Sequence, residues 1–189
     1  DSCFAKTVPS EETPARLYVG VAAQGRSQKV VMLRVYRALL AAAQKLYADN
    51  GGSRNKNNPA DPYMTLLGYF NALRELGGSR RLVEGEVRNQ ISRYSERRRV
   101  GETDPPFANR EIGIDPVELT SRVRTDQVAQ YKRNLALPFH DKHRVDVALA
   151  TNMISVGLDI PRLGLMVVYG QPKGSAEYIQ ATSRVGREK

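Results

Sequence analysis

The 189-residue chain has one cysteine, Cys3, only two histidines, His140 and His143, and no tryptophan. A single cysteine excludes an intramolecular disulfide framework, and so few cysteines and histidines do not support a zinc site. No apolar run approaches the roughly 20 residues of a membrane-spanning helix, and the N-terminal residues lack the apolar core of a signal peptide. We therefore expect a cytoplasmic protein with no metal site of its own and no membrane partner.

Two motifs of nucleotide hydrolysis are missing as well. The chain contains no G-x-x-x-x-G-K-[ST] phosphate loop, and no DEAD- or DEAH-like carboxylate motif follows an apolar strand. A polypeptide without these groups is not expected to hydrolyse a nucleotide efficiently by itself. Its first residue is not methionine, which favours an excised piece of a longer chain.

Basic residues and a globular proportion of apolar residues are what the chain does have. Twenty-nine Lys and Arg outnumber twenty Asp and Glu, for a net charge of +9, and 41% of the residues are hydrophobic. This length can bury one well-packed core, and the positive charge is typical of a protein that binds a polyanion. Nucleic acid is therefore a candidate partner.

The first part of the chain, residues 1–62, is interpreted as a lead-in segment that ends in a loop. Residues 16–25 predict a short strand, and residues 27–50 an amphipathic helix with Ser27 as its N-cap and Gly51 just beyond its end. Its predicted buried stripe has members three or four residues apart: Met32, Val35, Tyr36, Leu39, Ala43 and Leu46.

The second part, residues 63–189, predicts alternating strands and helices. A buried strand in 63–70 precedes helical spacing that Gly77 and Gly78 interrupt, so one broken helix and two short ones are equally compatible. Residues 97–116 are charged and rich in turn formers, which favours a flexible insertion. A short strand in 117–123 and a helix capped by Thr125 follow.

Two nearly continuous apolar runs, "RVDVALAT" and "LGLMVVYG", are typical of strands in a parallel sheet that helices cover on both faces. The expected fold class is therefore α/β, with a mostly parallel sheet and right-handed crossovers. Ligands of such sheets bind beyond the carboxyl ends of the strands. Polar residues follow the first of these strands, namely Thr151, Asn152 and Asp159, with Gly157 on the same loop.

The second run leads to a helix that Ser175 can cap and that carries Gln180. If this helix continues, Gln180, Arg184 and Arg187 share one face; if it stops near Ser183, Gly186 allows Arg187 to fold back toward the same ligand. Planar, permanently charged guanidinium groups suit phosphate oxygens. Taken alone, however, the last residues are better explained as a solvated basic tail. The structural alternatives for the other residues are that Asp159 shapes a turn, that Gln180 is a solvated helix residue and that Thr151 merely ends a strand.

These residues carry a resemblance to a known family. "ALATNMISVGLDIP" resembles motif V and "QATSRVGR" resembles motif VI of superfamily 2 helicases, with Ser183 where motif VI usually has glycine. "TLLGYFNALRELG" resembles motif IV. Taken together, the sequences of these segments are similar to the large helicase-like protein of bacterial DISARM antiphage systems. The resemblance implies a RecA-like three-layer α/β/α domain, the second of the two motor domains, over residues 63–189.

The resemblance also implies roles for the site residues. In this family ATP with Mg²⁺ lies between two RecA-like domains, the Mg²⁺ ligands being on the first domain. Arg184 and Arg187 would then be arginine fingers, helped by Gln180, and Gly157 and Asp159 would lie near the nucleotide. Thr151, Asn152 and Asn71 would contact the backbone of a nucleic acid, expected to be DNA.

The implied partners are the first RecA-like domain of the same full-length chain, nucleic acid and other proteins of a defence system. The alternative from a different class is a non-catalytic, basic RecA-like module that binds nucleic acid or protein.

Overall fold

A four-stranded parallel sheet forms the centre of the computed structural model, which describes residues 16–97, 100–151 and 159–186. Its strands are β1 (Leu66–Phe70), β2 (Val117–Leu119), β3 (Val147–Ala150) and β4 (Leu165–Tyr169), in the spatial order β2-β3-β1-β4. Every strand pair is parallel. The predicted parallel sheet is therefore confirmed.

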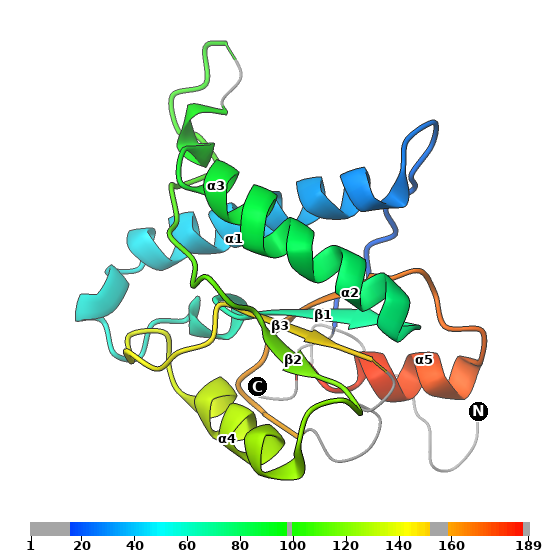
Figure 1. Cartoon of the computed structure of the whole chain (residues 1–189). Helices are drawn as coiled ribbons and strands as arrows, with labels where there is room; N and C mark the ends of the chain where they lie inside the picture. Colours follow the sequence, from blue (N-terminus) through cyan, green and yellow to red (C-terminus); the bar gives the residue numbers. More distant parts are fainter. Residues whose placement is uncertain (1–15, 98–99, 152–158, 187–189) are drawn as a thin grey trace, which may run out of the picture.

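Helices cover both faces of this sheet (Figure 1). One face carries α1 (Gln28–Asp49), α2 (Leu73–Leu82) and α3 (Arg88–Ile91), and the other carries α4 (Thr125–Ala136) and α5 (Ser175–Thr182). A hydrophobic core lies on each face of the sheet, and alternate residues of β1 point into the two cores. Leu66 and Phe70 pack into the core on the α1 side, and Leu67 and Tyr69 into the core on the α5 side. Because both faces are buried, all five residues of β1 are buried, and the domain has the predicted three layers.

Helix α1 begins after Ser27 and ends before Gly51, which has φ +93°, as its sequence predicts. Its buried face is wider than the predicted stripe and includes Met32, Leu33, Tyr36, Leu40, Ala43 and Tyr47. Leu46, predicted to be buried, is 46% exposed. Since α1 packs into the same core as β1, it completes one face of the sheet.

The segment after β1 is one continuous helical stretch. Gly77 and Gly78 lie inside α2 and do not interrupt it, and the irregularity falls instead on a π-helical turn, η3 (Val83–Val87), which leads directly into α3. Val83 and Val87 are both buried in the core. Short 3₁₀ turns occur at η1 (Gly52–Arg54), η2 (Asp61–Tyr63) and η4 (Tyr94–Glu96).

Two local predictions were wrong. Residues 16–25 form no strand; Leu17 and Val19 are 88% and 72% exposed, and within the described residues no strand pairs with this segment. A strand needs a hydrogen-bonding neighbour, which an apolar pattern alone does not supply. The N-caps of α4 and α5 are Arg124 and Gly174, so Thr125 and Ser175 are the first helical residues.

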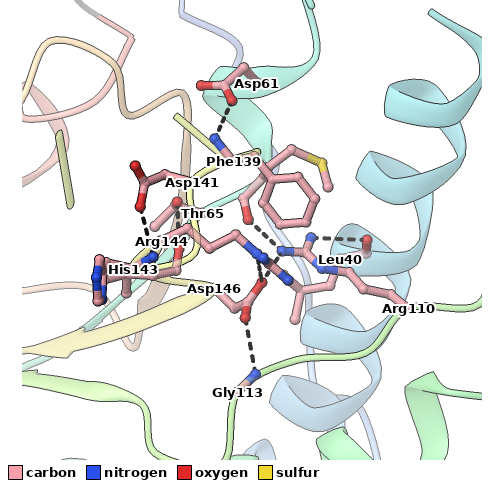
Figure 2. A network of polar contacts seen from close by, with 12 residues as sticks. Leu40, Asp61, Thr65, Arg110, Gly113, Phe139, Asp141, His143, Arg144 and Asp146 are labelled. Carbon is pink, nitrogen blue, oxygen red and sulfur yellow. Dashed lines mark hydrogen bonds and ion pairs between the residues drawn. The ribbon is translucent and has the colours of Figure 1, made fainter. Parts of the chain in front are cut away.

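The segment predicted as a flexible insertion sends one arginine into the core. Arg110 is 2% exposed, and its Nη2 donates hydrogen bonds to Met64 O (2.5 Å) and Asp146 Oδ1 (2.8 Å) (Figure 2). Asp146 Oδ2 accepts a hydrogen bond from Gly113 N at 3.0 Å. Burial lowers the pKa of Arg110, and the nearby Asp146 carboxylate opposes this effect. The network ties the insertion to the amino ends of β1 and β3.

Candidate functional site at the carboxyl edge of the sheet

The carboxyl ends of the four strands present polar residues along one edge. The pairing registers put Thr120, which follows β2, beside Thr151, which follows β3, and Asn71, which follows β1, beside Gly170, which follows β4. Thr120 and Thr151 are 1% and 3% exposed. Sequence reasoning identified Thr151 and Asn71 but missed Thr120, although the same rule about strand ends applies to it.

Asn71 bridges two strands at this edge. Its Nδ2 donates to Gly170 O at 2.9 Å and to Tyr169 O at 3.4 Å, while the residue remains exposed. The side-chain amide thereby joins the end of β1 to the end of β4. These hydrogen bonds fix the orientation of the Asn71 side-chain amide at the carboxyl edge of the sheet.

Helix α5 is held against the sheet by Tyr69. The Tyr69 Oη donates a hydrogen bond to Glu177 Oε1 at 2.8 Å, and Ala181 of α5 packs into the core beneath the helix. Burial, together with this hydrogen bond and the Glu177 charge, raises the pKa of Tyr69 above its usual range. Gln180 lies on the exposed side of α5.

The chain turns immediately after α5. The helix ends at Thr182 with Ser183 as its C-cap, Arg184 N donates to Ala181 O at 3.2 Å, and Gly186 N donates to Leu163 O at 2.7 Å. Gly186 has φ +64°, a left-handed conformation that glycine adopts without strain. Of the two alternatives for this segment, the structure therefore has the helix that stops near Ser183. Arg187 lies outside the described residues.

Residues near the start of the described chain contact this turn, and the sequence did not predict that contact. Arg16 Nε donates to Val185 O at 2.7 Å, and Tyr18 Oη donates to Thr182 Oγ1 at 3.4 Å. The Tyr18 and Tyr178 rings lie 6.3 Å apart, centroid to centroid. Residues more than 160 positions apart in the chain thus meet at the turn that carries Arg184.

The remaining predicted site residues are only partly described. Asn152 and Gly157 lie outside the described residues, whereas Asp159 is described and exposed. Arg184 is half-buried. Across residues 16–97, 100–151 and 159–186, no group of three or more His, Cys, Asp and Glu side chains could hold a metal ion. No helix in that part of the chain has the length and apolar character needed to span a bilayer.

A family model now decides the identity of this domain. The model described as helicase conserved C-terminal domain matches residues 82–189. The chain belongs to this helicase C-terminal domain family. The matched segment includes the ends of β2, β3 and β4, and therefore three of the four strand ends at the polar edge.

Individual relatives agree with this family. The helicase C-terminal domain is 44% identical over all 189 residues to "DISARM protein DrmA" of Bacillus paralicheniformis, of which it covers 16%. It is 34% identical over 103 residues to "Pre-mRNA-splicing ATP-dependent RNA helicase PRP28" of Meyerozyma guilliermondii, which is 48% of this chain and 17% of that protein. The chain thus spans about a sixth of the length of either relative.

A solved structure also matches, "S. cerevisiae Dbp5 bound to RNA and ADP BeF3", with a TM-score of 0.46 and 14% identity. The match covers 85% of this chain and 29% of that one.

Proposed function

We propose that this chain is the second motor domain of an ATP-dependent nucleic-acid helicase or translocase of superfamily 2. The observation that carries the proposal is the place of the two motif segments in the parallel sheet, one after β3 at the polar edge and the other after β4 on α5 and the turn that follows it. Thr151 follows β3 at that edge, Gln180 lies on α5, and Arg184 lies in the turn after α5, where Gly186 N donates to Leu163 O just before β4. The family membership of residues 82–189 supports the same assignment.

The residues present fit one wall of a nucleotide site. Arg184 and Arg187 would contact the phosphates of ATP, with Gln180 beside them, and Gly157 and Asp159 would lie near the ribose. ATP would supply the free energy of phosphoryl transfer, and positive guanidinium groups stabilise the charge that develops on the transferred phosphoryl group. In the described ranges no residue cluster suits Mg²⁺, so the Mg²⁺ ligands would come from a first RecA-like domain.

Nucleic acid would bind through its backbone at Thr151, Asn152 and Asn71. Hydroxyl, amide and main-chain groups hold a strand in position without reading its sequence. The net charge of +9 favours such a polyanion. We propose DNA as the nucleic acid, cytoplasmic antiphage defence as the role, and other proteins of a DISARM system as partners, since the identity to "DISARM protein DrmA" covers the whole chain.

The test is Arg187→Ala in the protein that contains both RecA-like domains. Arginine fingers contribute about 10³ to 10⁵ in rate, so we expect a loss of DNA-stimulated ATP hydrolysis of that order with retained DNA binding. Lost binding with normal ATP hydrolysis would instead identify a non-catalytic binding module. The 189-residue chain alone, which lacks a phosphate loop, should show no DNA-stimulated ATPase activity.

A further inference from the structure

Three cations share the outer surface between α1 and α2. Arg74 and Arg81 are seven residues apart on α2 and lie on the same side of it, and both are exposed. Lys29, in the first turn of α1, places its Nζ 3.2 Å from where a side chain on Gly78 would begin. Gly78 lies four residues after Arg74 and three before Arg81. The ammonium group of Lys29 therefore lies beside the helix surface between the two arginines.

These cations have no acidic partners in the described part of the chain. None of the three takes part in an ion pair or a side-chain hydrogen bond there, whereas the adjacent Arg80 pairs with Glu84 at 2.6 Å and Glu118 at 3.3 Å. Three uncompensated positive charges on one surface repel one another, and a polyanion relieves that repulsion. We name Lys29, Arg74 and Arg81 the α2 basic surface.

The position of this surface indicates which polyanion it suits. Arg74 follows Asn71 by three residues, so the surface starts where the proposed nucleic-acid edge ends. From Arg74 to Arg81 the helix advances about 10 Å at 1.5 Å per residue, which is enough to reach separate phosphates along a strand. Next to Gly78, nothing lies within 4 Å of the position of a side chain on Gly77, so the surface of α2 is open there.

We propose that the α2 basic surface binds the phosphate backbone of a nucleic-acid strand after it leaves the carboxyl edge of the sheet. This inference rests on the proposed function, which supplies the strand at that edge. It extends the contact surface from the motif IV segment, which contains Arg74, to Arg81 and Lys29, which lie outside the motif IV, V and VI segments. Contacts of this kind add affinity without sequence preference and respond strongly to salt.

The experiment measures binding of the 189-residue chain to fluorescently labelled single-stranded DNA by anisotropy, over a range of salt concentrations. Oligonucleotides of about 6 and about 20 nucleotides separate edge binding from binding that continues along α2. The test variant is Arg74→Gln with Arg81→Gln. The control variant, Arg54→Gln with Lys56→Gln, removes the same charge from an exposed loop beyond the other end of α1.

We expect the test variant to bind the long oligonucleotide about 25-fold more weakly at 0.1 M salt, from about 5-fold for each lost phosphate contact. Its salt slope, log Kd against log salt, should fall by about 1.4, while its binding of the short oligonucleotide and the control variant should change little. Melting temperatures equal to that of the wild type verify that both variants fold.

Three outcomes would overturn the inference. Wild-type binding that the test variant retains in full would overturn it alone and leave the proposed function intact. Equal losses in the test and control variants would show non-specific attraction. A wild-type chain that binds neither oligonucleotide would refute the nucleic-acid part of the proposed function as well. If such a chain bound an acidic protein through the α2 basic surface, that surface would be identified as a protein-binding surface.

Discussion

Gly68, in the middle of β1, is the position where the tertiary structure makes the sharpest prediction. The hydroxyl of Tyr36, from α1, occupies the space that a side chain on Gly68 would need. A methyl group there would overlap with Tyr36 Oη and would lie 2.9 Å from Leu149 Cδ2 and 3.2 Å from Tyr36 Cζ. Tyr36 and Leu149 are 0% and 1% exposed, so neither can move away into solvent.

The expected cost of Gly68→Ala follows from these contacts. Overpacking a well-filled core typically costs about 1–3 kcal/mol, which exceeds the gain of about 0.4–1 kcal/mol from a less flexible unfolded chain. We therefore expect the free energy of unfolding to fall by about 2 kcal/mol. For a chain of this size that corresponds to a melting temperature lower by about 4–8 °C.

Urea denaturation followed by circular dichroism measures this change, with a matched control on α2. Gly77→Ala adds the same methyl group where nothing lies within 4 Å, and it should stabilise the protein by about 0.5–1 kcal/mol. Tyr36→Phe removes the overlapping oxygen, so Gly68→Ala should cost less in that background. A Gly68→Ala protein as stable as the wild type, or an equal loss with and without the Tyr36 hydroxyl, would refute this account.

Two further predictions concern buried polar groups. Arg110→Ala removes the ion pair with Asp146, whose two atoms lie 2.8 Å apart, and should lower the free energy of unfolding by about 3–5 kcal/mol. The control Arg133→Ala, at an exposed position, should change it by less than about 0.5 kcal/mol. Similar urea midpoints for the two variants would contradict this prediction. Burial raises the pKa of Tyr36, so above about pH 10 the unfolded chain loses this proton before the folded one does. Stability should then fall by about 1.4 kcal/mol per pH unit more steeply in the wild type than in Tyr36→Phe, and parallel urea midpoints between pH 9 and 11.5 would exclude the effect.

Much of the fold could be predicted because it depends on local patterns. Apolar runs of strand length predicted β1, β3 and β4, and helical spacing with Ser27 and Gly51 at its ends predicted α1. The sequences of the three motifs indicated the helicase family, and the family-model match over residues 82–189 confirms it. The roles of Gln180, Arg184 and Asp159 remain predictions.

The errors arose where a partner far away in the chain decides the outcome. Residues 16–25 have an apolar pattern but no neighbouring strand among the described residues, and Arg16 and Tyr18 instead brace the turn after α5. The charged character of residues 97–116 also gave no sign that Arg110 is buried, with Asp146 and two backbone carbonyls receiving its hydrogen bonds. The flexibility of the insertion as a whole stays a prediction.

The sequence by itself determined the α/β class, the parallel sheet and the family, because hydrophobic periodicity and short motifs are properties of neighbouring residues. Only the tertiary structure decided that Tyr36 fills the space above Gly68, that Arg110 pairs with Asp146 thirty-six positions away, and that Lys29 joins the arginines of α2. Each of these contacts depends on how whole helices and strands pack against one another. No local pattern specifies that geometry, and the candidate nucleic-acid surface therefore became visible only in the folded chain.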